Sequence, residues 1–198
     1  MKKILLSITC CICALSAFGQ DNVKWQIFTY AGDTLRVPTV NGKIVYSVVF
    51  KSEGSSADDI YASAKIAIAD MFVSANSVVQ LDDAQNKTIV AKGRSHWVRN
   101  SEAVLTIGFD VKFTLKIECR DQRYRITIYD FTSEVGSGAY KFEVDEEIAL
   151  NYGVRKDKEV KKDRNGLSLP AWEAVSKDVA LDLKDRIEKN RNTSIEDW

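Results

Sequence analysis

The most restrictive feature of this sequence is the alternation of apolar and polar side chains between residues 103 and 120. Successive side chains of a β-strand point to opposite faces of a sheet, so this pattern predicts a long strand with one dry and one wet face. Such strands are typical of antiparallel sheets covered on one side only. The predicted dry face consists of Ala103, Leu105, Ile107, Phe109, Val111, Phe113, Leu115, Ile117 and Cys119.

The neighbouring segments continue this sheet. Asp121-Gln122 predicts a turn into residues 123–131, where Tyr124, Ile126 and Ile128 extend the dry face. Residues 77–81 and 87–97 read as two earlier strands around a polar turn, and Gly93 is expected at a bulge or bend. The sequence therefore predicts four consecutive antiparallel strands.

A hairpin is predicted nearer the N-terminus. Asn41-Gly42 separates two β-prone runs, and both residue types tolerate the positive φ of a tight hairpin turn. Pro38 lacks an amide donor, which favours a sheet edge for the strand before the turn. The strand after it places Ile44, Tyr46, Val48 and Phe50 on one face.

Two helices are expected to cover the dry face. The first is capped by Ser55 or Ser56, and Ile66 lies opposite its main apolar stripe, which predicts cover on both sides of the helix. The second opens at Pro170 and runs to about Lys189 with an apolar stripe of its own. The fold class is therefore α+β: a curved antiparallel sheet of about five strands, two helices on one face, the order β-α-β-β-β-β-α, and an N-terminal β-hairpin arm.

The N-terminal nineteen residues resemble a secretory signal peptide. Lys2 and Lys3 precede an apolar run that is too short to span a bilayer, and Ala17-Phe18-Gly19 predicts cleavage after Gly19. Within that segment Cys10, Cys11 and Cys13 act as small apolar residues. A lipid anchor on Cys10 is not favoured, because Ser7 and Thr9 do not fit a lipoprotein signal. The expected location is the periplasm or cell envelope of a Gram-negative bacterium.

We divide the remaining chain by composition. Residues 20–40 form the arm and edge strand, 41–135 the core domain, 136–168 a loop and charged segment, and 169–198 the C-terminal helix. Without Lys2 and Lys3 the chain has 26 basic and 28 acidic residues, a balance that argues against nucleic-acid partners. No transmembrane span is expected after residue 19, and Cys119 has no partner for an internal disulfide.

The chain resembles a family of secreted bacterial proteins of unknown function with a TATA-binding-protein-like (TBP-like) fold. The resemblance rests on KIVYSVVF after Asn41-Gly42, on IYASAKIAIADMF, on KTIVAKG and on RYRITIYDF, and it covers roughly residues 40–133. It implies the fold and export. It implies no activity, catalytic residue or cofactor, and a fold alone does not define function.

The sequence offers few residues for catalysis. His96 lacks triad motifs and is expected on the wet face, and Cys119 continues the dry face. Gly136-Ser137-Gly138 is too short for a phosphate loop. Four acidic residues lie close together, and we call them the acidic group: Glu143, Asp145, Glu146 and Glu147. Their spacing is not that of an EF-hand, so a solvated loop is predicted there, and no metal site or cofactor is expected.

The wet sheet face is the candidate binding surface. Its predicted site residues are Lys92, Arg94, Lys112, Lys116, Arg120, Arg125 and Tyr129. Asp110 and Glu118 lie among them, and Phe131 is expected on the same side. A locally basic, partly aromatic face can receive an anionic or glycan ligand or an envelope protein.

Two hypotheses of function follow. The preferred one is an exported, non-catalytic binding or interaction domain that uses the wet face or the N-terminal arm. The alternative is a hydrolase of an envelope or dietary polymer that uses carboxylates such as Asp145 and Glu147, which requires two carboxyl groups about 5–9.5 Å apart across a cleft.

Overall fold

The structure is a computed structural model that describes residues 23–30, 33–72, 78–98, 108–135, 142–153 and 168–196. The predicted signal peptide, its cleavage after Gly19 and the Gly136-Ser137-Gly138 segment lie outside these residues. None of the helices in the described ranges is both long and apolar enough to cross a bilayer.

The eight strands within these described residues form one antiparallel sheet in the order β1-β2-β3-β7-β6-β5-β4, with β8 paired to β7. The strands are β1 (Val23–Tyr30), β2 (Asp33–Val40), β3 (Lys43–Lys51), β4 (Val79–Asp83), β5 (Thr88–Val98), β6 (Gly108–Arg120), β7 (Arg123–Val135) and β8 (Phe142–Asp145). The helices are α1 (Ala57–Met71), α3 (Glu146–Gly153) and α4 (Ser168–Glu196). The predicted class and the five core strands are confirmed, and β1, β2 and β8 extend that sheet.

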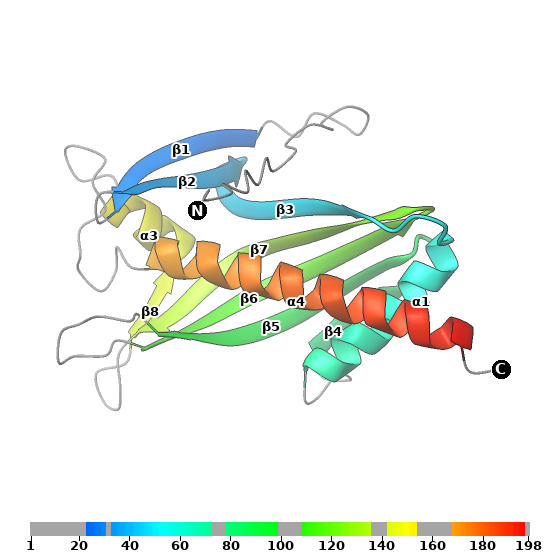
Figure 1. Ribbon diagram of the computed structural model, residues 1–198. Coiled ribbons are helices and arrows are strands. Elements are labelled where there is room, and N and C mark those ends of the chain that lie inside the picture. Colours follow the sequence, from blue (N-terminus) through cyan, green and yellow to red (C-terminus); the bar gives the residue numbers. More distant parts are fainter. Residues whose placement is uncertain are drawn as a thin grey trace, which may run out of the picture.

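Helices α1 and α4 lie against one face of the sheet and pack against each other (Figure 1). The odd-numbered residues of β6 from Phe109 to Cys119 are all buried beneath them, as the alternation predicts. Trp172 of α4 is fully buried and stacks on Phe131 with ring centroids 5.4 Å apart. Helix α1 is thus covered by the sheet on one side and by α4 on another, as expected. Ile66 is not part of either contact, because its side chain is 51% exposed.

The ends of the helices are held by side-chain hydrogen bonds. Ser56 caps α1 and forms a capping box with Asp59, so the predicted cap is confirmed. Near the end of α4, the Arg191 guanidinium donates to the hydroxyls of Ser52 at 2.8 Å and Ser55 at 2.7 Å. These bonds join the C-terminal part of α4 to the loop between β3 and α1.

The predicted hairpin turn between β2 and β3 is present, with φ of 51° at Asn41 and 80° at Gly42. The prediction that β2 lies at the sheet edge is wrong, because β1 pairs along its whole length. Strand β3 pairs with β2 only through Thr39 and Val40. On the β3 side Pro38 therefore has no strand opposite it, and its missing amide donor costs no ladder hydrogen bond there.

Gly93 marks a close packing contact, and its pairing with β6 contains no bulge. The β5–β6 register runs unbroken from Thr88 to Val98, with Gly93 opposite Phe113. A β-carbon added at Gly93 would collide with the Phe113 ring. Glycine is needed here because the aromatic ring lies across the backbone of its neighbour.

A β-bulge in β7 changes which side chains face inward. Lys112 pairs with Thr132 and Thr114 pairs with Tyr129, so two residues of β7 are opposite Phe113 alone. The first of them, Asp130, has φ of 54°, the left-handed conformation found in bulges of this kind. Phe131 is therefore buried, and its predicted place on the wet face is wrong.

The segment 136–168 contains more regular structure than predicted. A short strand was expected at residues 140–144, and β8 occupies 142–145. The acidic group, expected in a loop, spans β8 and the start of α3, and Glu146 within it is buried. Strand β8 pairs with β7 beyond the bulge, and α3 begins directly after β8. Glu146, the first residue of α3, therefore lies beside the buried backbone of β7.

Candidate functional site

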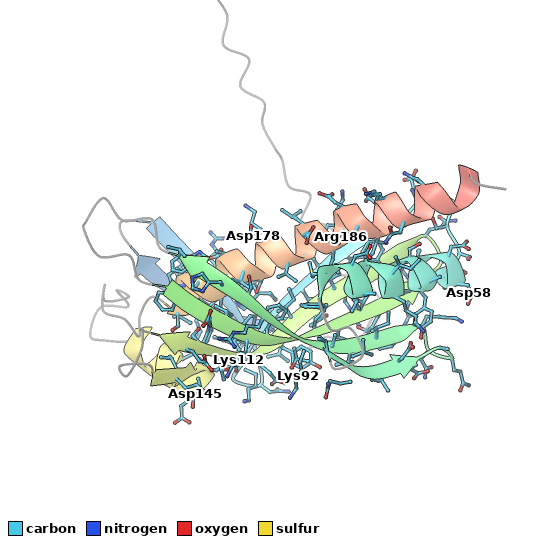
Figure 2. All side chains as sticks on the ribbon, turned by 90° about the horizontal axis from the view of Figure 1, so that it is seen from below. Asp58, Lys92, Lys112, Asp145, Asp178 and Arg186 are labelled. Atoms are coloured by element: carbon cyan, nitrogen blue, oxygen red, sulfur yellow. The ribbon has the colours of Figure 1, made fainter. Side chains whose placement is uncertain are left out.

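The candidate site is the wet face of the sheet, which we call the polar sheet face. Figure 2 shows Lys92 and Lys112 on the side of the sheet opposite Asp178 and Arg186 of α4. Neither α1 nor α4 therefore covers this face. Side chains alternate between the two faces of the sheet along β5 and β6. Ile89, Ala91 and Phe113 point into the core, so the predicted basic residues at the intervening positions lie on the polar sheet face.

Ion pairs connect the basic residues across β5, β6 and β7. Arg94 donates to Asp110 at 2.7 Å and approaches Glu134 at 3.3 Å. The Lys112 ammonium lies 2.6 Å from Glu134 and 4.0 Å from Glu143. The result is a continuous row of alternating charge along the polar sheet face.

A second charged group surrounds Glu118. Its carboxylate lies 3.0 Å from the Lys116 ammonium and 2.7 Å from the Arg125 guanidinium. Burial raises the pKa of Glu118, but hydrogen bonds from Lys116 and Arg125 outweigh that effect, so its pKa is lowered overall. Glu118 is thus ionised and holds two of the predicted binding residues in place.

The polar sheet face is more evenly charged than the sequence indicates. Six acidic residues, rather than two, lie among the six predicted basic residues. They are Asp110, Glu118, Asp130, Glu134, Glu143 and Asp145. Asp130 belongs to this face because it accepts a hydrogen bond from the Thr114 hydroxyl at 3.4 Å. A nearly balanced face suits a partner that carries both signs of charge better than a polyanion.

Sequence reasoning missed Glu134 because the bulge reverses the alternation after Asp130. Simple alternation from Tyr124 points Glu134 inward, whereas in the structure it pairs with Arg94 and Lys112 on the polar sheet face. The available signal was Asp130 itself, since aspartate interrupts an otherwise β-prone run and tolerates positive φ. Tyr129, just before the bulge, is half-buried, and burial raises its pKa.

Arg120 lies at the end of the sheet, beside an open hollow of about 470 Å³. The hollow lies where the β4–β5 and β6–β7 turns meet the start of α1, and Asp121 there accepts the Ala57 N–H at 2.8 Å. Its lining residues are Ala57, Gln85, Asn86, Lys87, Cys119, Arg120, Asp121 and Arg123. Lys87 and Arg123 were not among the predicted site residues, because they come to lie beside Arg120 only where two turns meet.

His96 and Cys119 lie where the sequence predicts. His96 is exposed and its Nδ1 lies 2.7 Å from Asp110 on the polar sheet face. Cys119 is buried, and burial raises the pKa of its thiol to about 12. The thiol is therefore protonated at neutral pH and a weak nucleophile. Within the described ranges no three His, Cys, Asp or Glu side chains converge as metal ligands.

The acidic group divides between solvent and core. Asp145 and Glu147, named for the hydrolase alternative, are exposed. Glu146 between them is buried, and its two carboxylate oxygens accept the N–H of Phe131 at 3.0 Å and of Ile44 at 3.2 Å. Burial raises the pKa of Glu146 despite these bonds. This carboxylate has a structural role that the sequence does not reveal.

Comparisons with known proteins agree with this architecture. Residues 46–134 match the model of a domain of unknown function (DUF4468) with TBP-like fold. This confirms the resemblance identified from the sequence, and the matched residues extend from within β3 to within β7.

Two crystal structures have a similar fold. One is a TBP-like protein from Parabacteroides distasonis, with 18% identity, coverage of 77% of this chain and 97% of that chain, and a TM-score of 0.61. The other is a DUF4468 family protein from Bacteroides ovatus, with 22% identity, coverage of 76% and 90%, and a TM-score of 0.58. No curated protein matches the chain. These similarities concern the fold, so the function has to be argued from this chain's own surfaces.

Proposed function

We propose that this chain is an exported, non-catalytic interaction domain of the bacterial cell envelope and that it binds a partner through the polar sheet face. The observation that supports the proposal is the row of paired, partly exposed charges across β5, β6 and β7, which lies on the side opposite α1 and α4 in the described part of the chain. Export is supported by the signal-like pattern of residues 1–19.

The energetics of these ion pairs favour a binding role. The side chains of Arg94 and Lys112 are 54% and 41% exposed. Ion pairs at such exposure contribute about 0–1 kcal/mol each to stability. A partner can therefore exchange them for its own charged groups at little cost to the fold. Complementary charges of this kind fix orientation and select against wrong partners.

The arrangement defines the class of partner. A polyanion would meet Glu134 and Glu143 beside Lys112, so like charges would oppose it. A protein surface that carries both signs of charge can satisfy the acidic and basic groups together. We therefore propose an envelope protein with a mixed-charge surface as the partner, in preference to an anionic glycan.

Site-specific photo-crosslinking in cells tests this proposal. A photoreactive residue replaces Lys92 on the polar sheet face or, as a control, Asp178 on α4, the two positions shown in Figure 2. We expect one discrete protein adduct from position 92 and none from position 178. The K112E/K116E pair should abolish the adduct, because it places new carboxylates beside Glu134 and Glu118.

The matched control is K177E/R186E, which reverses two charges on α4 and should leave the adduct unchanged. Far-UV circular dichroism of both double variants verifies that they are folded. Equal adduct yields from both crosslinking positions, or an adduct that survives K112E/K116E, would refute the assignment of the polar sheet face.

A further inference from the structure

The N-terminal strand β1 forms one end of the sheet. Within the described residues it pairs with β2 alone, through an unbroken register from Val23–Val40 to Tyr30–Asp33. Figure 1 shows the β1–β2 hairpin at the margin of the sheet, beyond β3. Alternate N–H and C=O groups of an edge strand point away from its neighbour, so β1 presents a backbone edge that another strand can pair with.

One face of β1 is apolar and exposed. Val23, Trp25 and Ile27 are 43%, 60% and 52% exposed and follow one another at every second position. The opposite face of the hairpin contains the buried Leu35 and Val37, so the exposed side chains do not serve this core. Scattered exposed apolar residues are ordinary, but a contiguous set with a large tryptophan indicates an interaction surface.

Strand β1 also lacks most features that prevent edge pairing. It has eight residues, its register with β2 contains no bulge, and its sequence VKWQIFTY contains no proline and a single charge, at Lys24. Natural edge strands are usually short, bulged, or protected by proline and charged side chains. An unprotected edge of this length is compatible with selection for pairing rather than against it.

We propose that β1 pairs antiparallel with β1 of a second copy of this chain, around a two-fold axis at Gln26. A residue that comes n positions after Gln26 in one copy then lies opposite the residue that comes n positions before Gln26 in the other copy. Trp25 of each copy therefore lies opposite Ile27 of the other, and both belong to the exposed apolar face. Aromatic and β-branched residues in directly opposed positions are favourable cross-strand pairs.

The same register avoids repulsion. Lys24, the single charge of the strand, lies opposite Phe28 of the second copy, so no like charges face each other. This self-complementarity is the reason to infer a second copy rather than an unrelated peptide: one surface patch supplies both halves of a two-fold interface. The resulting sheet is continuous across two chains. The pairing edge lies at β1, on the far side of β3 from the polar sheet face of β5–β7, so this inference is independent of the proposed function.

A cysteine crosslink tests the register directly. In the exported chain, Gln26→Cys places two thiols opposite each other at the two-fold axis, where Cα atoms of opposed residues are about 4.5–5.5 Å apart, within the range of a disulfide. We expect a disulfide-linked dimer under mild oxidation. Lys24→Cys, on the same face of the same strand, should give no dimer because Phe28 lies opposite it.

Sedimentation velocity over a concentration series measures the dimer without a crosslink. We expect a reversible dimer whose dissociation constant rises at least tenfold in the Trp25→Ser/Ile27→Ser variant. Both side chains are more than half exposed, so melting of the monomer should not change. A chain that stays monomeric throughout with no Gln26→Cys dimer, a dimer insensitive to the double change, or a monomer that instead captures another protein through β1 would each overturn the proposal.

Discussion

The side chain of Glu146 accepts a hydrogen bond from the backbone N–H of Phe131 at 3.0 Å inside the protein. Glu146 lies where two strands, β3 and β8, pair with the same edge of β7. Strand β3 pairs with β7 up to Tyr129, and β8 pairs with β7 from Thr132. The bulge between them leaves Phe131 without a strand partner on that edge, and the second carboxylate oxygen accepts the N–H of Ile44 where β3 begins to diverge.

Glu146→Ala should therefore destabilise the fold strongly. It leaves two buried N–H groups without an acceptor, and we expect a loss of about 2–4 kcal/mol in the free energy of unfolding. Urea unfolding measures this as a shift in midpoint. Glu147→Ala is the matched control, since Glu147 is its exposed neighbour on α3 and should change stability by less than about 0.5 kcal/mol. Equal effects of the two substitutions would show that the carboxylate does not hold these strands.

The raised pKa of Glu146 has a consequence for pH dependence. Burial favours the protonated form in the folded chain, with Lys43 lowering and Asp130 raising the same pKa. The folded state therefore binds this proton more tightly than the unfolded state. The resulting gain in stability is fully present below the ordinary pKa of glutamate, and it is lost as the pH rises through the pKa of Glu146 in the folded chain.

We expect the stability of the native chain relative to Glu146→Gln to be greatest in acid and to fall as the pH is raised to neutrality. Urea titrations at several pH values measure this difference, in which contributions from all other groups cancel. A difference that is constant with pH, or that grows on raising the pH, would contradict the direction of the shift.

The bulge depends on the conformation of Asp130. Its φ of 54° disfavours residues with a β-carbon by about 1–2 kcal/mol, and β-branched residues most of all. Asp130→Val should cost about 2 kcal/mol or more, whereas Asp130→Gly should stay within about 1 kcal/mol of the native chain, because glycine accepts this φ. Thermal unfolding distinguishes the two variants. Similar losses in both would mean that the hydrogen bond from Thr114, and not backbone strain, dominates at this position.

The contact between Gly93 and Phe113 predicts a second pair of outcomes. Gly93→Ala forces a β-carbon into the aromatic ring and should destabilise the chain by about 1–3 kcal/mol. Adding Phe113→Leu should recover part of this loss. The control is Gly108→Ala, where the nearest atom is Cε1 of His96 at 2.8 Å. This exposed side chain can move aside at the cost of its surface contact with Asp110. The explanation fails if Gly108→Ala costs as much, or if Phe113→Leu gives no recovery.

Local patterns predicted the elements that are repeated or geometrically simple. The alternation of β6 placed every odd-numbered residue from Phe109 to Cys119 correctly in the core, and it missed only the buried Thr114 on the opposite face of that stretch. Asn41-Gly42 identified the tight turn. Ser55 and Ser56 marked the start of α1, and the structure assigns the cap to Ser56. These predictions succeed because strand period, turn φ and helix capping each depend on residues within a few positions of one another.

The candidate site was predicted less completely. The basic side chains on β5 and β6 were placed correctly, but Glu134 and Glu143, which nearly balance their charge, were not. One bulge moved Phe131 from the polar sheet face into the core and Glu134 in the opposite direction. A one-residue shift reverses every later side chain of a strand, so a small local event changes the character of a whole surface.

Residues close together in the sequence account for the one-sided apolar sheet, for the two helices that cover it and for the tight turn at Asn41-Gly42. The sharing of one β7 edge by β3 and β8, and the burial of Glu146 between these strands, follow from the folded arrangement of distant segments. A buried backbone N–H needs an acceptor. Phe131 is left without a strand partner only after β3 and β8 have paired with β7, so the residues next to Phe131 in the sequence do not show that Glu146 will accept its N–H.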